Sequence, residues 1–231
     1  MSLVYLATTS SLLSDLVTGH NDACCGGAIY DNIRNIIISV TNGYNGCRDV
    51  YVTYLNDGAT KLKKELVPFS VTNHAPVYDG KKYVYFMEYS YQDGNGKRFG
   101  RIDLDTFVFE ELPSLPDMKF AATFSGCFHN ENVYAVRNDS ELCCYNVIER
   151  KWNCCDIKVP ADNEDICVRL LNDPHNESNC IYMMGYNSQG GLYCIDLDKH
   201  EVNLISKLPV IYDMLRDALL VQTESNEFIV V

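Results

Sequence analysis

A phrase of similar residues recurs five times along this chain, about every 48 residues. Each copy centres on a pair of adjacent apolar residues, and the second members of successive pairs are 47, 49, 48 and 47 positions apart. The five pairs are Ile37-Ile38, Val84-Tyr85, Val133-Tyr134, Ile181-Tyr182 and Phe228-Ile229. Repeats of this length indicate units that are each too small to bury their own hydrophobic face, so neighbouring units must pack together.

Turn-forming residues precede each apolar pair, and a proline closes each of the first four units. The prolines are Pro68, Pro116, Pro160 and Pro209. The turn clusters are Asp31-Asn32, Asp79-Gly80, Asn130-Glu131, Asn172-Asp173-Pro174 and Ser225-Asn226. Because Asp, Asn and Gly tolerate left-handed backbone or bond to their own main chain, these clusters predict hairpin turns.

A second hairpin follows each apolar pair after a looser loop. In residues 101–110, polar and apolar residues alternate around a tight turn at Asp105-Thr106, and residues 145–152 and 195–202 superpose on this segment without a gap. Each unit is therefore predicted to be a meander of four short strands. Units of this size and strand number are typical of the blades of a β-propeller, whose radial closure protects the sheet edges.

The two ends of the chain supply half a unit each. The last repeat has only two predicted strands, 218–224 and 227–231, whereas 3–8 and 12–17 resemble the missing second hairpin. We therefore expect an all-β propeller of five four-stranded blades, the last completed by both termini, with residues 1–231 as a single domain. The alternative is a chain cut from a longer repeat protein, with arbitrary ends.

Charge and hydropathy limit the partners and the compartment. The net charge of −12 argues against nucleic acid, because that affinity rests on Lys and Arg neutralising phosphates. No segment approaches the length of a membrane span, and the N-terminus lacks the basic leader of a signal peptide. We expect a cytoplasmic chain that binds no membrane and forms a monomeric domain.

The chain has eleven cysteines, several of them as adjacent pairs. An odd number with such pairs does not resemble the disulfide framework of a secreted domain. A turn around residues 148–150 would place Cys143 opposite Cys155 and Cys144 opposite Cys154. Adjacent residues in a strand point to opposite faces, so one sheet cannot direct all four thiols at one zinc ion. We expect reduced thiols packed between blades, and no metal site or cofactor.

The segment from Tyr145 to Trp152, followed by Pro160, resembles the kelch repeat, in which a Tyr-Asp start, a short turn and a tryptophan lead to a proline-ended loop. Similar segments run from Ile102-Asp103 to Pro116 and from Ile195-Asp196 to Pro209. The paired glycines of kelch repeats are missing, and only one unit keeps the tryptophan. The resemblance implies a propeller that binds a protein partner, for example as the substrate-recognition part of a ubiquitin ligase or as a cytoskeletal adaptor.

We expect a non-catalytic protein–protein interaction domain, with contacts made by loops that differ between blades. Tyr and Arg are enriched in binding hot spots, which favours residues in the loops after the second strands and between blades. The predicted contact residues are Tyr44, Asn45, Tyr91, Arg98, Asn138, Asp165 and Tyr186. The alternative is a propeller hydrolase or isomerase with a carboxylate-lined axial pocket; no catalytic motif is predicted.

Overall fold

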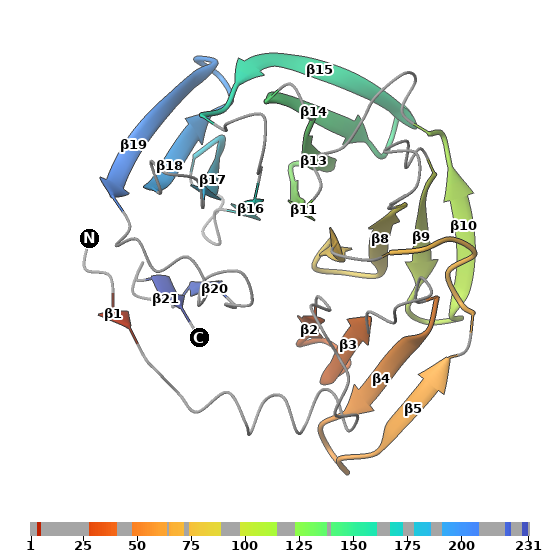
Figure 1. Ribbon diagram of the computed structural model, residues 1–231. Helices are drawn as coiled ribbons and strands as arrows, with labels where there is room; N and C mark the ends of the chain where they lie inside the picture. The colour runs from red at the N-terminus through yellow and green to blue at the C-terminus, as the bar shows by residue number, and fades with distance from the viewer. Residues whose placement is uncertain are drawn as a thin grey trace.

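The computed structural model contains strands and turns arranged as a ring of sheets around a centre (Figure 1). The structure describes residues 4–5, 28–40, 48–63, 65–71, 74–88, 98–114, 123–137, 140–160, 167–172, 178–185, 191–207, 220–222 and 228–230. The predicted all-β propeller is confirmed.

Four antiparallel meanders of four strands form the blades, each running from an inner to an outer strand. Blade 1 comprises β2 (Ala28–Asp31), β3 (Ile36–Val40), β4 (Val50–Tyr54) and β5 (Thr60–Lys63). Blade 2 comprises β7 (Val77–Tyr78), β8 (Tyr83–Met87), β9 (Phe99–Asp103) and β10 (Val108–Leu112). Blade 3 comprises β12 (Cys127–His129), β13 (Asn132–Val136), β14 (Glu141–Asn146) and β15 (Lys151–Lys158). Blade 4 comprises β16 (Cys167–Asn172), β17 (Cys180–Gly185), β18 (Gly191–Asp196) and β19 (Glu201–Lys207).

The recurring apolar pairs lie in the second strand of each blade, where both faces of the sheet are covered by neighbouring blades. Ile38, Val84, Val133 and Ile181 are all at most 1% exposed. A strand buried on both faces needs apolar residues at successive positions rather than in alternation. The outer strands have one covered face at most, and β19 is exposed along most of its length.

The hydrophobic core consists of the layers between blades. One cluster joins blade 1 to blade 2 through side chains such as Ile38, Val52 and Ile102, with Phe69 from the connecting segment. A second cluster joins blades 2, 3 and 4 through side chains that include Phe99 and Tyr145. No blade has a core of its own, as expected for a repeat unit of this size.

The hairpin turns fall where the sequence predicts them. Asn130 and Glu131 both have positive φ (46° and 57°), as a two-residue turn with left-handed central residues requires. The Asp79-Gly80 turn uses Gly80 at φ 75°, and the turn after Asp31 ends at Asn35 with φ 53°. These residues match the prediction for the first three units, and the predicted turns at Asp173-Pro174 and Ser225-Asn226 lie outside the described residues.

Two short strands on the inner side of the ring were not expected from the sequence. β6 (His74–Ala75) and β11 (Thr123–Ser125) come just before the inner strands of blades 2 and 3. β11 pairs in parallel with β6 on one side and with β16 on the other. Main-chain hydrogen bonds thus connect the inner strands of consecutive units, in addition to the side-chain packing between blades.

The chain ends meet, but the expected count of five four-stranded blades is wrong. Among the described residues, four sheets contain a four-stranded meander, and the sheet between blade 4 and blade 1 has three strands (Figure 1). These are β20 (Leu220–Gln222), β21 (Phe228–Val230) and β1 (Val4–Tyr5). β1 pairs with β21 in parallel, so it does not continue the antiparallel meander as the predicted second hairpin would. The predicted strand 12–17 lies outside the described residues.

The predicted cysteine register in blade 3 is also wrong by one residue. Cys143 lies opposite Cys154, and Cys144 lies opposite Asn153. The register shifts between Glu141 and Cys143, and Asp156 on the facing strand has a positive φ of 54°. Between the turn and Cys143 the pairing is regular, starting with Asn146 opposite Lys151, so the error comes from the turn, which has four residues, 147–150, rather than the predicted three.

Candidate functional site

The ring has two faces that differ in their connections. The turns between the first and second strands and between the third and fourth strands lie on one face, which we call the turn face. The loops between the second and third strands and between blades lie on the other, the loop face. This arrangement follows from the antiparallel order within each blade.

The predicted contact residues are expected on the loop face. Tyr44, Asn45, Tyr91, Asn138, Asp165 and Tyr186 lie outside the described residues. Arg98, at the start of the third strand of blade 2, is described. Its guanidinium donates to both carboxylate oxygens of Glu111 (2.8 and 3.1 Å) and to the Pro68 carbonyl oxygen (3.1 Å), and it lies over the Phe69 ring. Arg98 therefore ties blade 2 to the segment that leaves blade 1, and a role in partner binding stays a prediction.

The turn face repeats one local structure in the outer hairpins of blades 2, 3 and 4. Asp103, Asn146 and Asp196 each accept hydrogen bonds from the backbone N–H groups two and three positions later. The fourth residue after each of them has a left-handed backbone, with φ of 54° to 57°. These residues are Phe107, Arg150 and His200. The Asp or Asn of the kelch-like signature is thus a turn cap, because its side chain satisfies main-chain donors that the turn leaves open.

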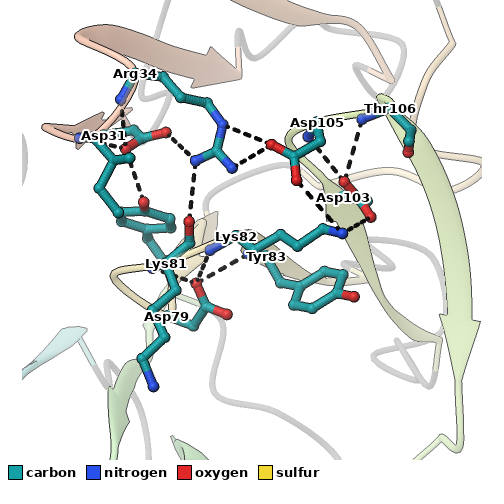
Figure 2. Close-up of polar contacts among 11 residues, drawn as sticks. Asp31, Arg34, Asp79, Lys81, Lys82, Tyr83, Asp103, Asp105 and Thr106 are labelled. Atoms are coloured by element: carbon teal, nitrogen blue, oxygen red, sulfur yellow. Dashed lines mark hydrogen bonds and ion pairs between the residues drawn. The ribbon is translucent and has the colours of Figure 1, made fainter.

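A polar cluster on the turn face links blade 1 to blade 2, and we call this junction seam 1–2 (Figure 2). Arg34, in the turn after β2, is at its centre. Its Nη1 donates to Asp31 Oδ2 at 2.8 Å and to the Lys81 carbonyl oxygen at 3.0 Å. Its Nε and Nη2 both donate to Asp105 Oδ1, in the outer turn of blade 2. One guanidinium therefore connects three turns from two blades, a role that suits its fixed fork of donors.

Asp31 is the buried anion of this cluster, with no exposed surface. Its Oδ1 accepts from the backbone N–H of Ile33 (2.9 Å) and from the hydroxyl of Tyr78 in the inner strand of blade 2 (2.9 Å). Burial by itself raises the pKa of Asp31, but hydrogen bonds from Arg34, Tyr78 and the turn backbone outweigh it and lower the pKa. Burial and the hydrogen bond to Asp31 raise the pKa of the Tyr78 hydroxyl. Asp31 is therefore held as a charged acceptor.

Lys82 extends the cluster along blade 2. Its Nζ lies 2.9 Å from Asp103 Oδ2 and 3.5 Å from Asp105 Oδ2. The hydrogen bonds from Arg34 lower the pKa of Asp105. Slight burial acts to raise the pKa of Asp103, but Lys82 and the turn N–H groups lower it. A general acid needs a pKa near the working pH, so these cation-paired carboxylates suit an ion-pair network rather than proton transfer.

The junction of blades 3 and 4, seam 3–4, uses a histidine and asparagines at the equivalent place. His129 ends the inner strand of blade 3, as Asp31 ends that of blade 1, and is 1% exposed. Its Nδ1 lies 2.7 Å from Asn172 Oδ1 in the inner strand of blade 4, and its Nε2 lies 3.0 Å from Asn130 Nδ2. Its Nε2 also lies 3.1 Å from Asn179 Oδ1, so asparagine side chains contact both ring nitrogens. Asn179 continues the cluster, since Asn130 donates to it and it donates to Asp198.

The junction of blades 2 and 3, seam 2–3, is aromatic. The Phe99 ring lies 4.9 Å from both the Tyr145 and the Trp152 rings, between centroids, in edge-to-face geometry. Trp152 Nε1 donates to the carbonyl oxygen of Pro113, which follows the outer strand of blade 2, at 3.0 Å. Tyr85 stacks on Phe128, which occupies the place of Tyr78 and Asn172 in the other blades. Seam 2–3 therefore uses aromatic packing, whereas the other two seams use hydrogen-bonded polar groups.

Exposed apolar side chains also gather on the turn face. Ile33 in the inner turn of blade 1 is 63% exposed, and Ile148 in the outer turn of blade 3 is 76% exposed. Among the described residues, the exposed large hydrophobic side chains at or beside these turns are Tyr30, Ile33, Leu55, Val108 and Ile148. Charged residues also lie in the turns of this face, among them Lys81 and Glu131, which are 3.5 Å apart between Nζ and Oε1. Apolar side chains set among charges are the usual composition of a protein-binding surface.

Within the described ranges, no group of three or more His, Cys, Asp or Glu side chains is placed to hold a metal ion. The same part of the chain contains no helix with the length and apolar content needed to cross a membrane.

No family model matches the chain, and no curated protein matches it. Solved structures do match its fold. A protein of unknown function from Bacteroides thetaiotaomicron VPI-5482 superposes with a TM-score of 0.64 at 13% identity, over 92% of this chain and 54% of its own. The RRP9 WD40 repeats superpose with a TM-score of 0.56 at 11% identity, over 80% and 52%. U3-55K gives a TM-score of 0.54 at 10% identity, over 79% and 52%.

These likenesses show the propeller fold, and their identities are too low to show more. The chain spans about half the length of the structures that it matches. The kelch-like signature at Tyr145–Trp152 is a resemblance in sequence, whereas the similar structures include WD40 repeats.

Proposed function

We propose that this chain is a non-catalytic protein-interaction domain that binds a protein partner with one face of the ring. The observation that supports the proposal most is the set of exposed apolar side chains on the turn face, led by Ile33 and Ile148. Large side chains that remain exposed beside charged turns offer the apolar anchors that a partner can cover.

The state of the described carboxylates also favours binding over catalysis. Asp31, Asp103 and Asp105 are paired with Arg34 or Lys82, and each has a lowered pKa. The solved WD40-repeat structures support the fold in which the proposed face is built.

The finer parts of the proposal rest on sequence. The Asp-capped turns at Asp103, Asn146 and Asp196 fit degenerate kelch repeats, because they place the signature residue in a defined role. A place in a ubiquitin ligase or a cytoskeletal adaptor follows from that resemblance alone. The cytoplasm is the proposed compartment, and the domain is proposed to act as a monomer without nucleic acid or membrane.

The test is affinity capture with the full chain from the source cell, quantified by mass spectrometry. The double variant Ile33→Asp/Ile148→Asp places charges on the turn face and should lose the captured partner. Leu204→Asp/Ile205→Asp makes the same change on the exposed outer strand of blade 4 and should retain it. Both pairs of side chains are exposed, so the fold should tolerate either change.

The loop-face prediction is tested in the same experiment by Tyr44→Ala/Tyr91→Ala/Tyr186→Ala. Arg98 is left out, because its contacts with Glu111 and Pro68 make any substitution a change in blade packing. Loss of the partner only in the tyrosine variant would move the binding surface to the loop face. A wild-type chain that captures nothing beyond an unrelated control domain would contradict the proposed function.

A further inference from the structure

Blade 3 carries two pairs of neighbouring thiols, one on each face of its outer hairpin. Cys143 and Cys154 are direct cross-strand partners, and their thiols are within hydrogen-bonding distance. Cys144 and Cys155 also hydrogen-bond to each other, although Cys144 lies opposite Asn153. The Cys143–Cys154 pair shares its face with Tyr145 and Trp152, toward blade 2, because alternate residues of a strand share a face.

The two pairs differ in whether they can be bridged. Directly opposite residues of an antiparallel pair have Cα atoms about 4.5–5.5 Å apart, within the range of about 4.4–6.8 Å that a disulfide spans. A diagonal pair such as Cys144 and Cys155 is ordinarily about 7–8 Å apart, beyond that range. The register therefore favours a bond between Cys143 and Cys154.

The surroundings assign different roles to the two thiols. Cys154 is exposed, and Arg137 Nη1 donates to its Sγ at 3.8 Å. Its exposure gives an oxidant direct access to the sulfur. Cys143 is fully buried, and its thiol donates to the Glu141 carbonyl oxygen at 4.0 Å. Burial raises the pKa of the Cys143 thiol, so Cys143 stays protonated until its neighbour has reacted.

We propose that Cys154 and Cys143 form a peroxide-sensitive modification site that closes to a disulfide between β14 and β15. The Cys154 thiolate attacks one oxygen of hydrogen peroxide and becomes a sulfenic acid, while the other oxygen leaves as hydroxide and takes up a proton to form water. The Cys143 thiol then attacks the Cys154 sulfur, and the sulfenic hydroxyl leaves with the thiol proton as a second water. Two thiols and one peroxide thus yield one disulfide and two waters.

The disulfide would restrict the movement of β15, the strand whose Trp152 contacts blade 2 at seam 2–3. Trp152, two residues before Cys154, contacts Phe99 and donates to the Pro113 carbonyl oxygen of blade 2. Oxidation therefore ties the outer strand of blade 3 to its neighbour beside this contact.

The test is peroxide treatment of the full chain, alkylation of free thiols, and non-reducing tryptic mapping by mass spectrometry. Arg137, Arg150, Lys151 and Lys158 are the cleavage sites that separate the strands, so Cys143 and Cys154 fall in peptides 138–150 and 152–158. The linked pair of peptides should appear in the wild type and persist in Cys144→Ser/Cys155→Ser. It should be lost in Cys154→Ser, an exposed position where the fold should tolerate serine.

Reduction with dithiothreitol should release the two peptides and restore both free thiols. A link that disappears in Cys144→Ser/Cys155→Ser but survives in Cys154→Ser would overturn the assignment. Wild-type protein in which peroxide yields only unlinked peptides would overturn the proposal altogether.

Discussion

Seam 1–2 and seam 3–4 both join adjacent inner strands through a buried polar side chain, but the side chains differ in chemistry. Asp31 and His129 are each the last residue of an inner strand, each is almost completely buried, and each bonds to the next blade's inner strand. Asp31 is a charged acceptor paired with Arg34, whereas His129 is surrounded by asparagine amides. Both seams therefore place a hydrogen-bonding group at this position, a carboxylate in one and an imidazole in the other.

The largest effect should follow from placing the charge of seam 1–2 into seam 3–4. His129→Asp would bury a carboxylate among Asn130, Asn172 and Asn179, with the anion Asp198 bonded to the last of these. Without a cation we expect a loss of about 4 kcal/mol in the free energy of unfolding at pH 7, measured by urea denaturation. The loss should shrink as the pH falls, because the new carboxyl group can then take up a proton.

His200→Asp is the matched control, since His200 is exposed in the outer turn of blade 4 and Asp tolerates its left-handed backbone. It should change the free energy of unfolding by no more than about 0.5 kcal/mol. Equal stability of His129→Asp and the wild type would show that seam 3–4 can accept a charge.

Removing the charge from seam 1–2 should have the next largest effect. Asp31→Ala leaves the Tyr78 hydroxyl and part of the Arg34 guanidinium without an acceptor, so we expect a loss of about 3 kcal/mol in urea denaturation. Asp57→Ala removes an exposed carboxylate that caps only its own turn, and should cost about 1 kcal/mol or less. Similar losses for the two variants would contradict the role of Asp31 between blades.

The charge of Asp31 should also have a smaller effect, on how the free energy of unfolding depends on pH. The pKa of Asp31 is lowered in the fold, so its stabilising contribution is present above the ordinary carboxyl pKa of about 4 and is lost as the pH falls through the lowered value. The free energy of unfolding of Asp31→Asn should therefore fall less steeply than that of the wild type below about pH 4. Equal slopes in the two proteins would show that Asp31 is not held as an anion.

The smallest change should come from Tyr78→Phe. The variant removes one of several donors to Asp31, so we expect a loss of about 1 kcal/mol, measured by urea denaturation. Phe128 at the equivalent place in blade 3 shows that the fold accepts this ring. A loss as large as that of Asp31→Ala would mean that the Tyr78 hydroxyl, rather than Arg34, supplies most of the stabilisation between blades 1 and 2.

The sequence predicts the units well because their strands and turns depend on nearby residues. Ile38 and Val133 are buried as their periodic spacing requires, and Asn130-Glu131 turns where polar residues interrupt the pattern. Contacts between units are harder to predict. Arg34 bonds to Asp105, 71 positions away, and only the placing of the two turns brings them together.

The count of four-stranded blades and the thiol register failed for a related reason. The blade count depends on the parallel pairing of β1, and the thiol register depends on a turn of four residues rather than three; neither feature has a signature in residue type. The equivalence of Asp31 and His129 can be recognised from the sequence, since both end the segment before a recurring apolar pair. The repeat register could have marked His129 as a junction residue, whereas its residue type alone indicated a surface histidine.

Trp152 gives the molecule a built-in optical reporter. It is the single tryptophan of the chain, and its indole is hydrogen-bonded and packed at seam 2–3. Emission excited at the red edge of the absorption band therefore comes from one junction only. A fluorescence melt will register the separation of blades 2 and 3, and will be silent to events elsewhere in the ring that leave this indole in place.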